Sequence, residues 1–265
     1  MPFENVNLIP IYISLGIGAL LVVLALWKKV LTIPATITAF VVLVLSALFT
    51  SYTGLVVFSV SFIFAAIIGL IKRDERKAVE EGRYPREGAR GIVQVLANAL
   101  PALIYGAVYF GTGKASFLIA SAVTVTAGIA DSAASDIGNL SRGKVVSILT
   151  FKRVERGMSG GVSLLGTLSA LITSLIVSIV VFSVGEVGLK GLLVVAVCGF
   201  LGTLVDSFLG ASLQRAYRCV ECGFITERKE HCNKPTELIK GIKFVDNNVV
   251  NVVSLIIAGA ISLVF

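Results

Sequence analysis

Charge is scarce in this chain of 265 residues, because Asp, Glu, Lys and Arg together make up only 15% of it. A soluble domain carries about 25% charged residues. Hydrophobic residues make up 56% of the chain, and its mean hydropathy is +0.93. These values exclude a disordered chain, a collagen-like chain and a water-soluble enzyme with an ordinary charged surface. They indicate a polytopic integral membrane protein.

Histidine and cysteine are also rare, with one His and four Cys in the chain. Four cysteines are too few for a fold built on disulfides. The net charge of +7 would suggest nucleic-acid binding in a soluble protein. Here the basic residues lie in short segments between apolar runs, so membrane topology accounts for them. We therefore expect no nucleic-acid partner.

Eight apolar runs are long enough to be membrane spans, since a helical span needs about 20 mainly apolar residues. The sequence therefore predicts an all-α, polytopic helical bundle with about eight transmembrane helices. One domain, residues 1–265, uses the whole chain. The predicted spans are residues 8–26, 34–50, 54–71, 92–110, 115–134, 162–182, 189–213 and 246–265.

The distribution of Lys and Arg among the loops predicts the orientation, because cytoplasmic loops carry the excess of these residues. If both termini lie outside the cell membrane, only Lys114 and Lys190 fall in outer loops. Adding or removing one span would destroy this bias. The outer loops are very short, so any polar site is expected on the cytoplasmic side. Segment 72–90 mixes both charge signs, which indicates a solvated helix and turn.

Three aspartates lie toward the cytoplasmic ends of predicted spans, although a charge at the centre of a span costs about 2.5–3.5 kcal/mol. Asp131 and Asp136 are five residues apart, and a helix break at Gly138–Asn139 would let both reach one ion. Asp206 shares a helix face with Gln214. Paired carboxylates at a membrane boundary are typical of a Mg²⁺ site that also receives substrate phosphates. The simpler alternative is that these are acids at helix ends that reach the interface.

A basic, glycine-rich stretch precedes the sixth predicted span. Exposed N–H groups of such a loop and the positive end of the following helix dipole favour an anion. The alternative is a flexible entry loop whose small residues permit close helix packing. The nearby GNLSRGK (138–144) fits a phosphate-binding loop only in part, because Val145 stands where Ser or Thr is needed. The predicted phosphate-binding residues are Arg142, Lys144, Lys152, Arg153, Arg156, Gly157, Ser159, Gly160, Gly161, Ser163 and Thr167.

Further polar residues are expected to contact the sugar or base of a nucleotide. Asn247 and Asn251 share one face of the last span. The alternative is that Asp246 caps this helix and the amides connect helices. All these groups lie at one membrane face, so together they predict a single site for a nucleotide with magnesium. The added candidates are Ser207, Gln214, Asp246, Asn247, Asn248 and Asn251.

A cytoplasmic loop, residues 214–245, contains three cysteines and the single histidine. Cys219 and Cys222 have the C-x-x-C spacing of metal sites, and His231 and Cys232 follow nearby. A structural Zn²⁺ would hold this loop together. Free thiols or a redox pair remain alternatives, and the adjacency of His231 and Cys232 is unusual for a zinc site.

Several motifs in a fixed order are together more specific than any one of them. They resemble the transmembrane protein 19 family of polytopic membrane proteins, whose plant member is the chloroplast phytyl-phosphate kinase of tocopherol synthesis. The resemblance covers residues 82–265. It departs from the family pattern at Asp136, where glutamate is frequent, and at Met158 and Asn248, which bear on donor preference and metal count. The motifs are ADSAASDIG (130–138), RGMSGGVSLLGTLSA (156–170), GTLVDSFLGASLQ (202–214), the Cys219, Cys222 and Cys232 loop, and DNNVVN (246–251).

The resemblance implies an enzyme that transfers the γ-phosphate of a nucleoside triphosphate, expected to be CTP, to a prenyl monophosphate. The product would be a prenyl diphosphate. Asp131, Asp136 and Asp206 would then hold Mg²⁺ at the catalytic centre. Two other functions remain open: a transporter or channel, and another CTP-using lipid enzyme such as a cytidylyltransferase. Oligomeric state has no signature in the sequence.

Overall fold

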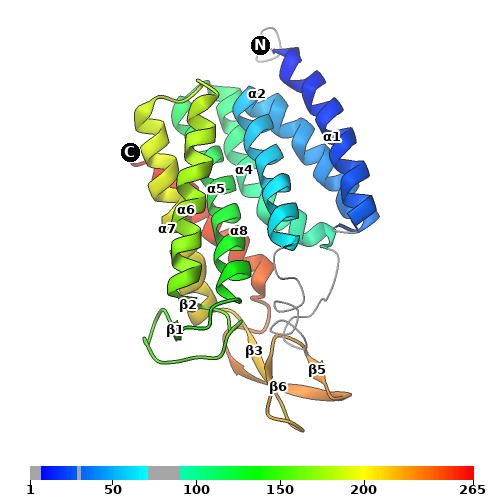
Figure 1. Ribbon diagram of the computed structural model, residues 1–265, viewed down its shortest axis with the longest axis vertical. Coiled ribbons are helices and arrows are strands. Elements are labelled where there is room, and N and C mark those ends of the chain that lie inside the picture. Colours follow the sequence, from blue (N-terminus) through cyan, green and yellow to red (C-terminus); the bar gives the residue numbers. More distant parts are fainter. Residues whose placement is uncertain (1–6, 29–30, 71–89) are drawn as a thin grey trace.

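Helices make up most of the chain in the computed structural model, which describes residues 7–28, 31–70 and 90–265. The predicted charged segment 72–90 lies outside the described residues except for Arg90. Two groups of helices stand side by side, with strands gathered at one end (Figure 1). The helices are α1 (Leu8–Lys28), α2 (Ile33–Leu70), α4 (Ile92–Thr112), α5 (Ala115–Gly138), α6 (Leu164–Ser183), α7 (Leu189–Ser212) and α8 (Asn247–Ser262).

The predicted membrane bundle is confirmed, and the count of eight spans is approximate. Within the described ranges, six helices are long and apolar enough to cross a membrane. The second and third predicted spans both fall in α2, which is broken by non-helical backbone at Thr50 and Ser51. Figure 1 shows the chain reversing direction at this break. The eighth predicted span, α8, has only 16 residues, fewer than the roughly 20 of a full span.

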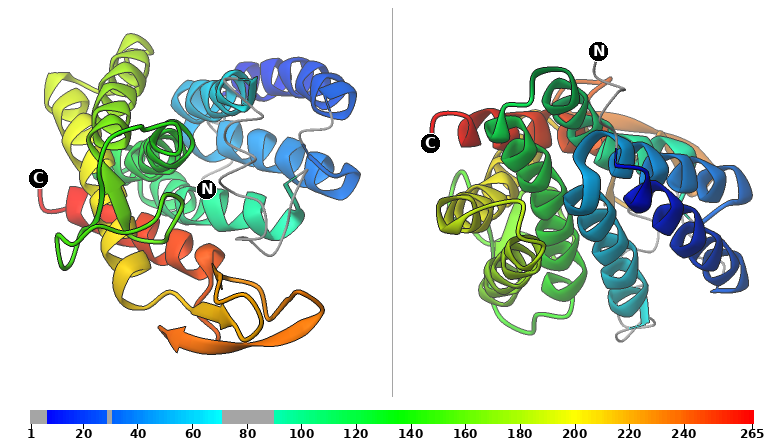
Figure 2. Two further views of the ribbon diagram at one scale, coloured as in Figure 1. Left: turned by 60° about the horizontal axis from the view of Figure 1, so that its bottom comes forward. Right: turned by 90° about the horizontal axis from the view of Figure 1, so that it is seen from above.

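Helix α5 is the central element, because it contacts α2, α4, α6, α7 and α8. Viewed from above, α1 and α2 lie on one side of it, and α6 and α7 lie on the other (Figure 2). Small residues allow this close packing. A side chain at Gly166 of α6 would place Cβ only 2.7 Å from the backbone oxygen of Ala134 in α5, so these helices meet backbone to backbone.

Apolar side chains also cover much of the outer helix surface. On α6, Leu168, Ile172, Leu175, Ile176 and Ile179 are all between 45% and 57% exposed. A contiguous apolar surface of this kind would be unfavourable in water. It is the surface expected of a helix that faces lipid tails.

Short strands, which the sequence analysis did not predict, form two sheets at one end of the bundle. β1 (Val145–Ser147) pairs antiparallel with β2 (Gly161–Ser163), so the basic and glycine-rich stretch forms the connection between them. The second sheet lies in the predicted 214–245 loop and has the order β4-β3-β6-β5. Its strands are β3 (Ala216–Cys219), β4 (Ile225–Thr226), β5 (Glu230–His231) and β6 (Lys234–Lys240).

Candidate functional site

A cavity lies at the end of the bundle that bears the strands. Its walls come from the C-terminal halves of α5 and α7, the N-terminal half of α6, and the β1–β2 connection. They bound about 860 Å³ of space, including the part open to solvent. Apolar side chains of Ala170, Phe200 and Leu204 also line the wall. The cavity therefore combines polar and apolar surfaces.

Two of the three predicted metal-binding aspartates, Asp131 and Asp206, line this cavity. The Asp131 carboxylate interacts electrostatically with those of Asp206 and Asp136. Asp136 lies near the end of α5, which stops at Gly138 as expected, but is not part of the cavity wall. The hydroxyl of Ser254 in α8 donates a hydrogen bond to Asp206 Oδ2 at 2.8 Å. Three carboxylates from two helices thus lie close together.

These carboxylates fit a hard divalent cation. Within the described ranges, no lysine or arginine forms an ion pair with Asp131 or Asp206. Grouped carboxylates in a partly buried site are unfavourable unless a positive charge compensates them. Oxygen ligands of this kind suit Mg²⁺, which combines one or two carboxylates with waters and phosphate oxygens.

The glycine-rich segment 157–161 forms another wall of the cavity. Gly157 and Gly160 have φ values of +78° and +77°, a region that side chains disfavour. At Gly160 an added Cβ would lie 2.4 Å from the backbone nitrogen of Ala211 in α7. The loop therefore lies directly against the C-terminal end of α7, near Asp206.

Helix α6 begins at the cavity. Ser163 is its N-cap, and the Ser163 hydroxyl accepts a hydrogen bond from the backbone N–H of Gly166 at 3.1 Å. Ser163, Gly166 and Thr167 all line the wall. The positive end of the α6 dipole thus lies beside the glycine-rich segment, an arrangement that favours a bound anion.

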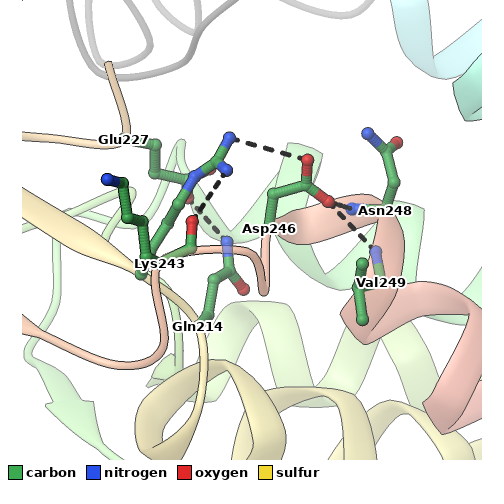
Figure 3. A network of polar contacts seen from close by, with 7 residues as sticks. Gln214, Glu227, Lys243, Asp246, Asn248 and Val249 are labelled. Carbon is green, nitrogen blue, oxygen red and sulfur yellow. Dashed lines mark hydrogen bonds and ion pairs between the residues drawn. The ribbon is translucent and has the colours of Figure 1, made fainter. Parts of the chain in front are cut away.

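Glu227 connects the larger sheet to this wall, and sequence reasoning missed it. It follows β4 and is only 5% exposed. Its Oε1 accepts hydrogen bonds from Ser159 Oγ at 2.8 Å and from Gln214 Nε2 at 2.7 Å. Figure 3 shows Gln214 pointing toward Glu227. Burial raises the pKa of Glu227, although hydrogen bonds from Ser159 and Gln214 and the charge of Arg215 act in the opposite direction.

Lys240, at the end of β6, holds the same loop from another side. Its Nζ donates hydrogen bonds to the backbone oxygens of Gly210 at 3.0 Å and Ser159 at 3.4 Å. Burial lowers the pKa of Lys240, and the charge of Glu227 partly offsets this effect. Two side chains of the larger sheet therefore fix the position of Ser159.

Amide side chains connect α8 to α4. Asn247 lines the cavity. The Asn251 side-chain amide lies 3.4 Å from Asn247 Nδ2 and 3.1 Å from Asn98 Oδ1 of α4, and with the amide turned over its nitrogen donates to Asp206 Oδ2 at 3.3 Å. The sequence analysis did not include Asn98, but its four-residue spacing from Gln94 within an apolar span was an available signal.

The other predicted residues are divided between the cavity and its surroundings. Ser207, Gln214 and Arg156 line the cavity, and Arg156 is the only Lys or Arg among the described residues that does so. Four predicted phosphate contacts are exposed and lie outside the cavity wall: Arg142, Lys144, Lys152 and Arg153.

Asp246 and Asn248 also lie outside the cavity wall. Asp246 is the N-cap of α8, because its Oδ1 accepts from the backbone N–H groups of Asn248 and Val249 at 3.0 and 3.2 Å (Figure 3). Its Oδ2 lies 3.6 Å from Arg215 Nη2. The capping alternative therefore describes Asp246, and its contact with a nucleotide remains a prediction.

The four predicted zinc ligands come together at the larger sheet. The ligand atoms of Cys219, Cys222, His231 and Cys232 all lie within 4.8 Å of one another. This cluster is separate from the cavity, since none of the four lines it.

Comparison with known proteins places the chain in a family. Residues 16–259 match the family described as integral membrane protein DUF92. Protein PGR of Arabidopsis thaliana is 36% identical over 141 residues, which cover 48% of this chain and 47% of the plant protein. The uncharacterized membrane protein MJ0933 of Methanocaldococcus jannaschii is 27% identical over 201 residues, which cover 73% of this chain and 76% of that protein.

A third relative, the uncharacterized membrane protein sll0875 of Synechocystis, is 26% identical over 166 residues, covering 62% of this chain and 64% of that protein. No solved structure matches the fold. The matches confirm the family resemblance predicted from the motifs. This chain belongs to the integral membrane protein DUF92 family.

Proposed function

We propose that this protein is a membrane lipid-phosphate kinase that converts a prenyl monophosphate to the diphosphate, with CTP as the phosphate donor. The observation that carries the proposal is the convergence of Asp131, Asp206 and the glycine-rich segment 157–161 on one cavity. Membership in the family that the motifs resemble supports it further. Phosphoryl transfer depends mainly on positioning and charge neutralisation, which are what these groups supply.

The apolar residues that line the cavity support a lipid as the acceptor. Asp206 lies six residues after Phe200 on α7, or about 9 Å along the helix axis. A lipid phosphate could keep its head group among the polar residues while its hydrocarbon tail contacts Phe200, Leu204 and Ala170. A water-soluble acceptor would have no use for this apolar wall.

The chain's own residues would divide the work as follows. Asp131 and Asp206, with Asp136 beside them, would hold Mg²⁺, which when bound neutralises charge on the phosphate oxygens. Arg156 and the backbone N–H groups of Ser159 and Gly160 would bind phosphates, whereas the N–H groups of Met158 and Gly161 already donate within the loop. An oxygen of the acceptor phosphate forms a bond to the γ-phosphorus, and the bond from that phosphorus to the β–γ bridging oxygen breaks, releasing CDP. The acceptor is already ionised, so no general base is required.

Orientation is part of the proposal. The Lys and Arg distribution supports an orientation with the strand-bearing end in the cytoplasm, where nucleotides are available, and with both termini outside. The beginning of α1 and the end of α8 lie away from the strands in Figure 1, as an even number of crossings requires.

The test is an assay of the products. Purified protein in liposomes is incubated with Mg²⁺, CTP or ATP, and geranylgeranyl or phytyl monophosphate, and the lipid and nucleotide products are identified by mass spectrometry. The expected result is lipid diphosphate with an equal amount of CDP. Release of pyrophosphate with a cytidylyl-lipid product would instead identify a cytidylyltransferase. No product with any donor and acceptor pair would overturn the proposal.

A further inference from the structure

A cluster of soft ligands lies outside the cavity, on the larger sheet. Cys219 ends β3, Cys222 lies in the following turn, and His231 and Cys232 lie where β5 turns into β6. The Cys222 and Cys232 sulfurs are 3.8 Å apart. His231 Nδ1 lies 3.4 Å from Cys222 Sγ and 3.3 Å from Cys232 Sγ. The four residues come from two different turns of the sheet.

The three distances among Cys222, His231 and Cys232 are close to those of a tetrahedral metal site, and Cys219 Sγ lies within 4.8 Å of the other three ligand atoms. Zn–S bonds of about 2.3 Å and Zn–N bonds of about 2.0–2.1 Å give tetrahedral edges of about 3.8 Å between sulfurs and 3.5 Å between sulfur and nitrogen. A disulfide would need about 2.05 Å between sulfurs, and all four cysteines of the chain are free. We propose that Cys219, Cys222, His231 and Cys232 bind one structural zinc ion.

The backbone around the cluster is shaped to present these ligands. The turn after Cys219 uses Gly223 at φ +73°, and the backbone N–H of Gly223 donates to the Cys219 carbonyl oxygen at 2.9 Å. Cys232 has a φ of +53°, an unusual conformation for a residue with a side chain.

The histidine ring is also held in place. Phe224 stacks on His231, with ring centroids 5.3 Å apart and planes inclined by 23°. Fixing the orientation of a histidine ligand is a common role of the groups around a metal. Adjacent His and Cys ligands are unusual for a zinc site. Here both can bind one ion, because the turn at Cys232 brings the Cys232 sulfur close to the His231 ring.

The zinc ion would also order the glycine-rich segment of the cavity. β4 and β5 have only two residues each, and such short strands need additional support. The same sheet supplies Glu227 and Lys240, both of which bond to Ser159. By stabilising this sheet, the zinc ion would also hold segment 157–161 in place through Glu227 and Lys240. Neither zinc binding nor the order of segment 157–161 depends on the proposed kinase function.

The first experiment measures metal content. The full-length protein is purified in detergent under reducing conditions, dialysed against metal-free buffer, and analysed by elemental mass spectrometry. The expected result is one zinc per chain, lost in the double variant Cys222→Ser/Cys232→Ser and retained in the control Cys198→Ala, whose cysteine is buried in α7. Folded wild-type protein without metal, iron in place of zinc, or zinc retained in the double variant would overturn the proposal.

A second experiment uses wild-type protein, so it does not depend on the folding of a variant. Zinc is removed with a chelator and Co²⁺ is added. The expected absorption spectrum has the visible bands of tetrahedral Co²⁺ with thiolate ligands, whereas an octahedral Co²⁺ spectrum would refute the site. Hydrogen exchange in residues 157–163 should increase after zinc removal and return when zinc is restored. Unchanged exchange there would refute the coupling between sheet and loop.

Discussion

At the scale of single residues, the site depends on a few buried polar groups with well-defined partners. Asp206 has one oxygen bonded to Ser254, and Glu227 accepts two hydrogen bonds through one oxygen. The sequence singled out Asp206, because an acid within an apolar span is conspicuous. It did not single out Glu227, because a glutamate in a charged loop has no feature that distinguishes a buried side chain from an exposed one.

Ser254→Ala removes the hydroxyl that orients Asp206. Changing an outer contact of a metal ligand costs about 10–100-fold in metal affinity, so the Mg²⁺ concentration for half-maximal product formation should rise by about that factor. The matched control is Ser262→Ala, which removes a buried hydroxyl of the same helix that bonds only to Gly259 within α8. Equal Mg²⁺ requirements in both variants would show that Asp206 does not bind the metal.

Glu227 should give the stability a specific pH dependence. The pKa of Glu227 is raised in the folded state. As pH rises, the unfolded chain loses this proton at a pKa of about 4.3, and the folded protein loses it only at a higher pH. The stabilisation present at low pH is therefore lost as pH rises through the folded-state pKa.

The variant Glu227→Gln cannot ionise at this position, so its stability should not show this decrease with rising pH. Relative to Glu227→Gln, the melting temperature of the wild-type protein should fall as pH rises from about 5 to 8. Thermal melts of both proteins in one series of buffers provide the comparison. A difference that stays constant with pH, or that increases, would contradict the raised pKa.

At the scale of elements, the connection between β1 and β2 forms the wall of the cavity that is proposed to bind phosphate. It is held by α7 beneath it and by Glu227 and Lys240 of the larger sheet. The sequence correctly indicated a glycine-rich segment before α6, but it did not indicate the flanking strands. Strands of two to seven residues contain too little periodic pattern to be read from one sequence.

Gly160→Ala should damage this connection. A left-handed backbone with a side chain costs about 1–3 kcal/mol, and Cβ would overlap the backbone of Ala211. We expect loss of nucleotide binding together with a lower melting temperature. Gly143→Ala is the control, since its Cβ would make only an ordinary contact of 3.5 Å with Ser141. Equal nucleotide affinity in the two variants would refute a phosphate-binding role for the loop.

At the scale of the whole molecule, hydropathy was sufficient to predict the bundle, because each span must bury its backbone hydrogen bonds in a helix and cover itself with apolar side chains. It was not sufficient for the exact number of spans. Non-helical backbone at Thr50 and Ser51 divides the 38 residues of α2 into two helical segments, and α8, with 16 residues, is shorter than a full span. The sequence also predicted that the polar motifs lie close together. This prediction needed only the alternation of inner and outer loops, which brings the ends of the relevant spans to the same side of the membrane.

Magnesium-dependent nucleotide binding tests the central claim most directly. The melting temperature of the purified protein is measured with CTP and Mg²⁺ together and with each alone, in wild type, Asp131→Asn, Asp206→Asn and the control Glu186→Gln. Glu186 lies between α6 and α7, outside the cavity wall. The account predicts stabilisation by CTP and Mg²⁺ together in wild type and Glu186→Gln, and none in the two aspartate variants. Undiminished stabilisation in Asp131→Asn and Asp206→Asn would contradict it.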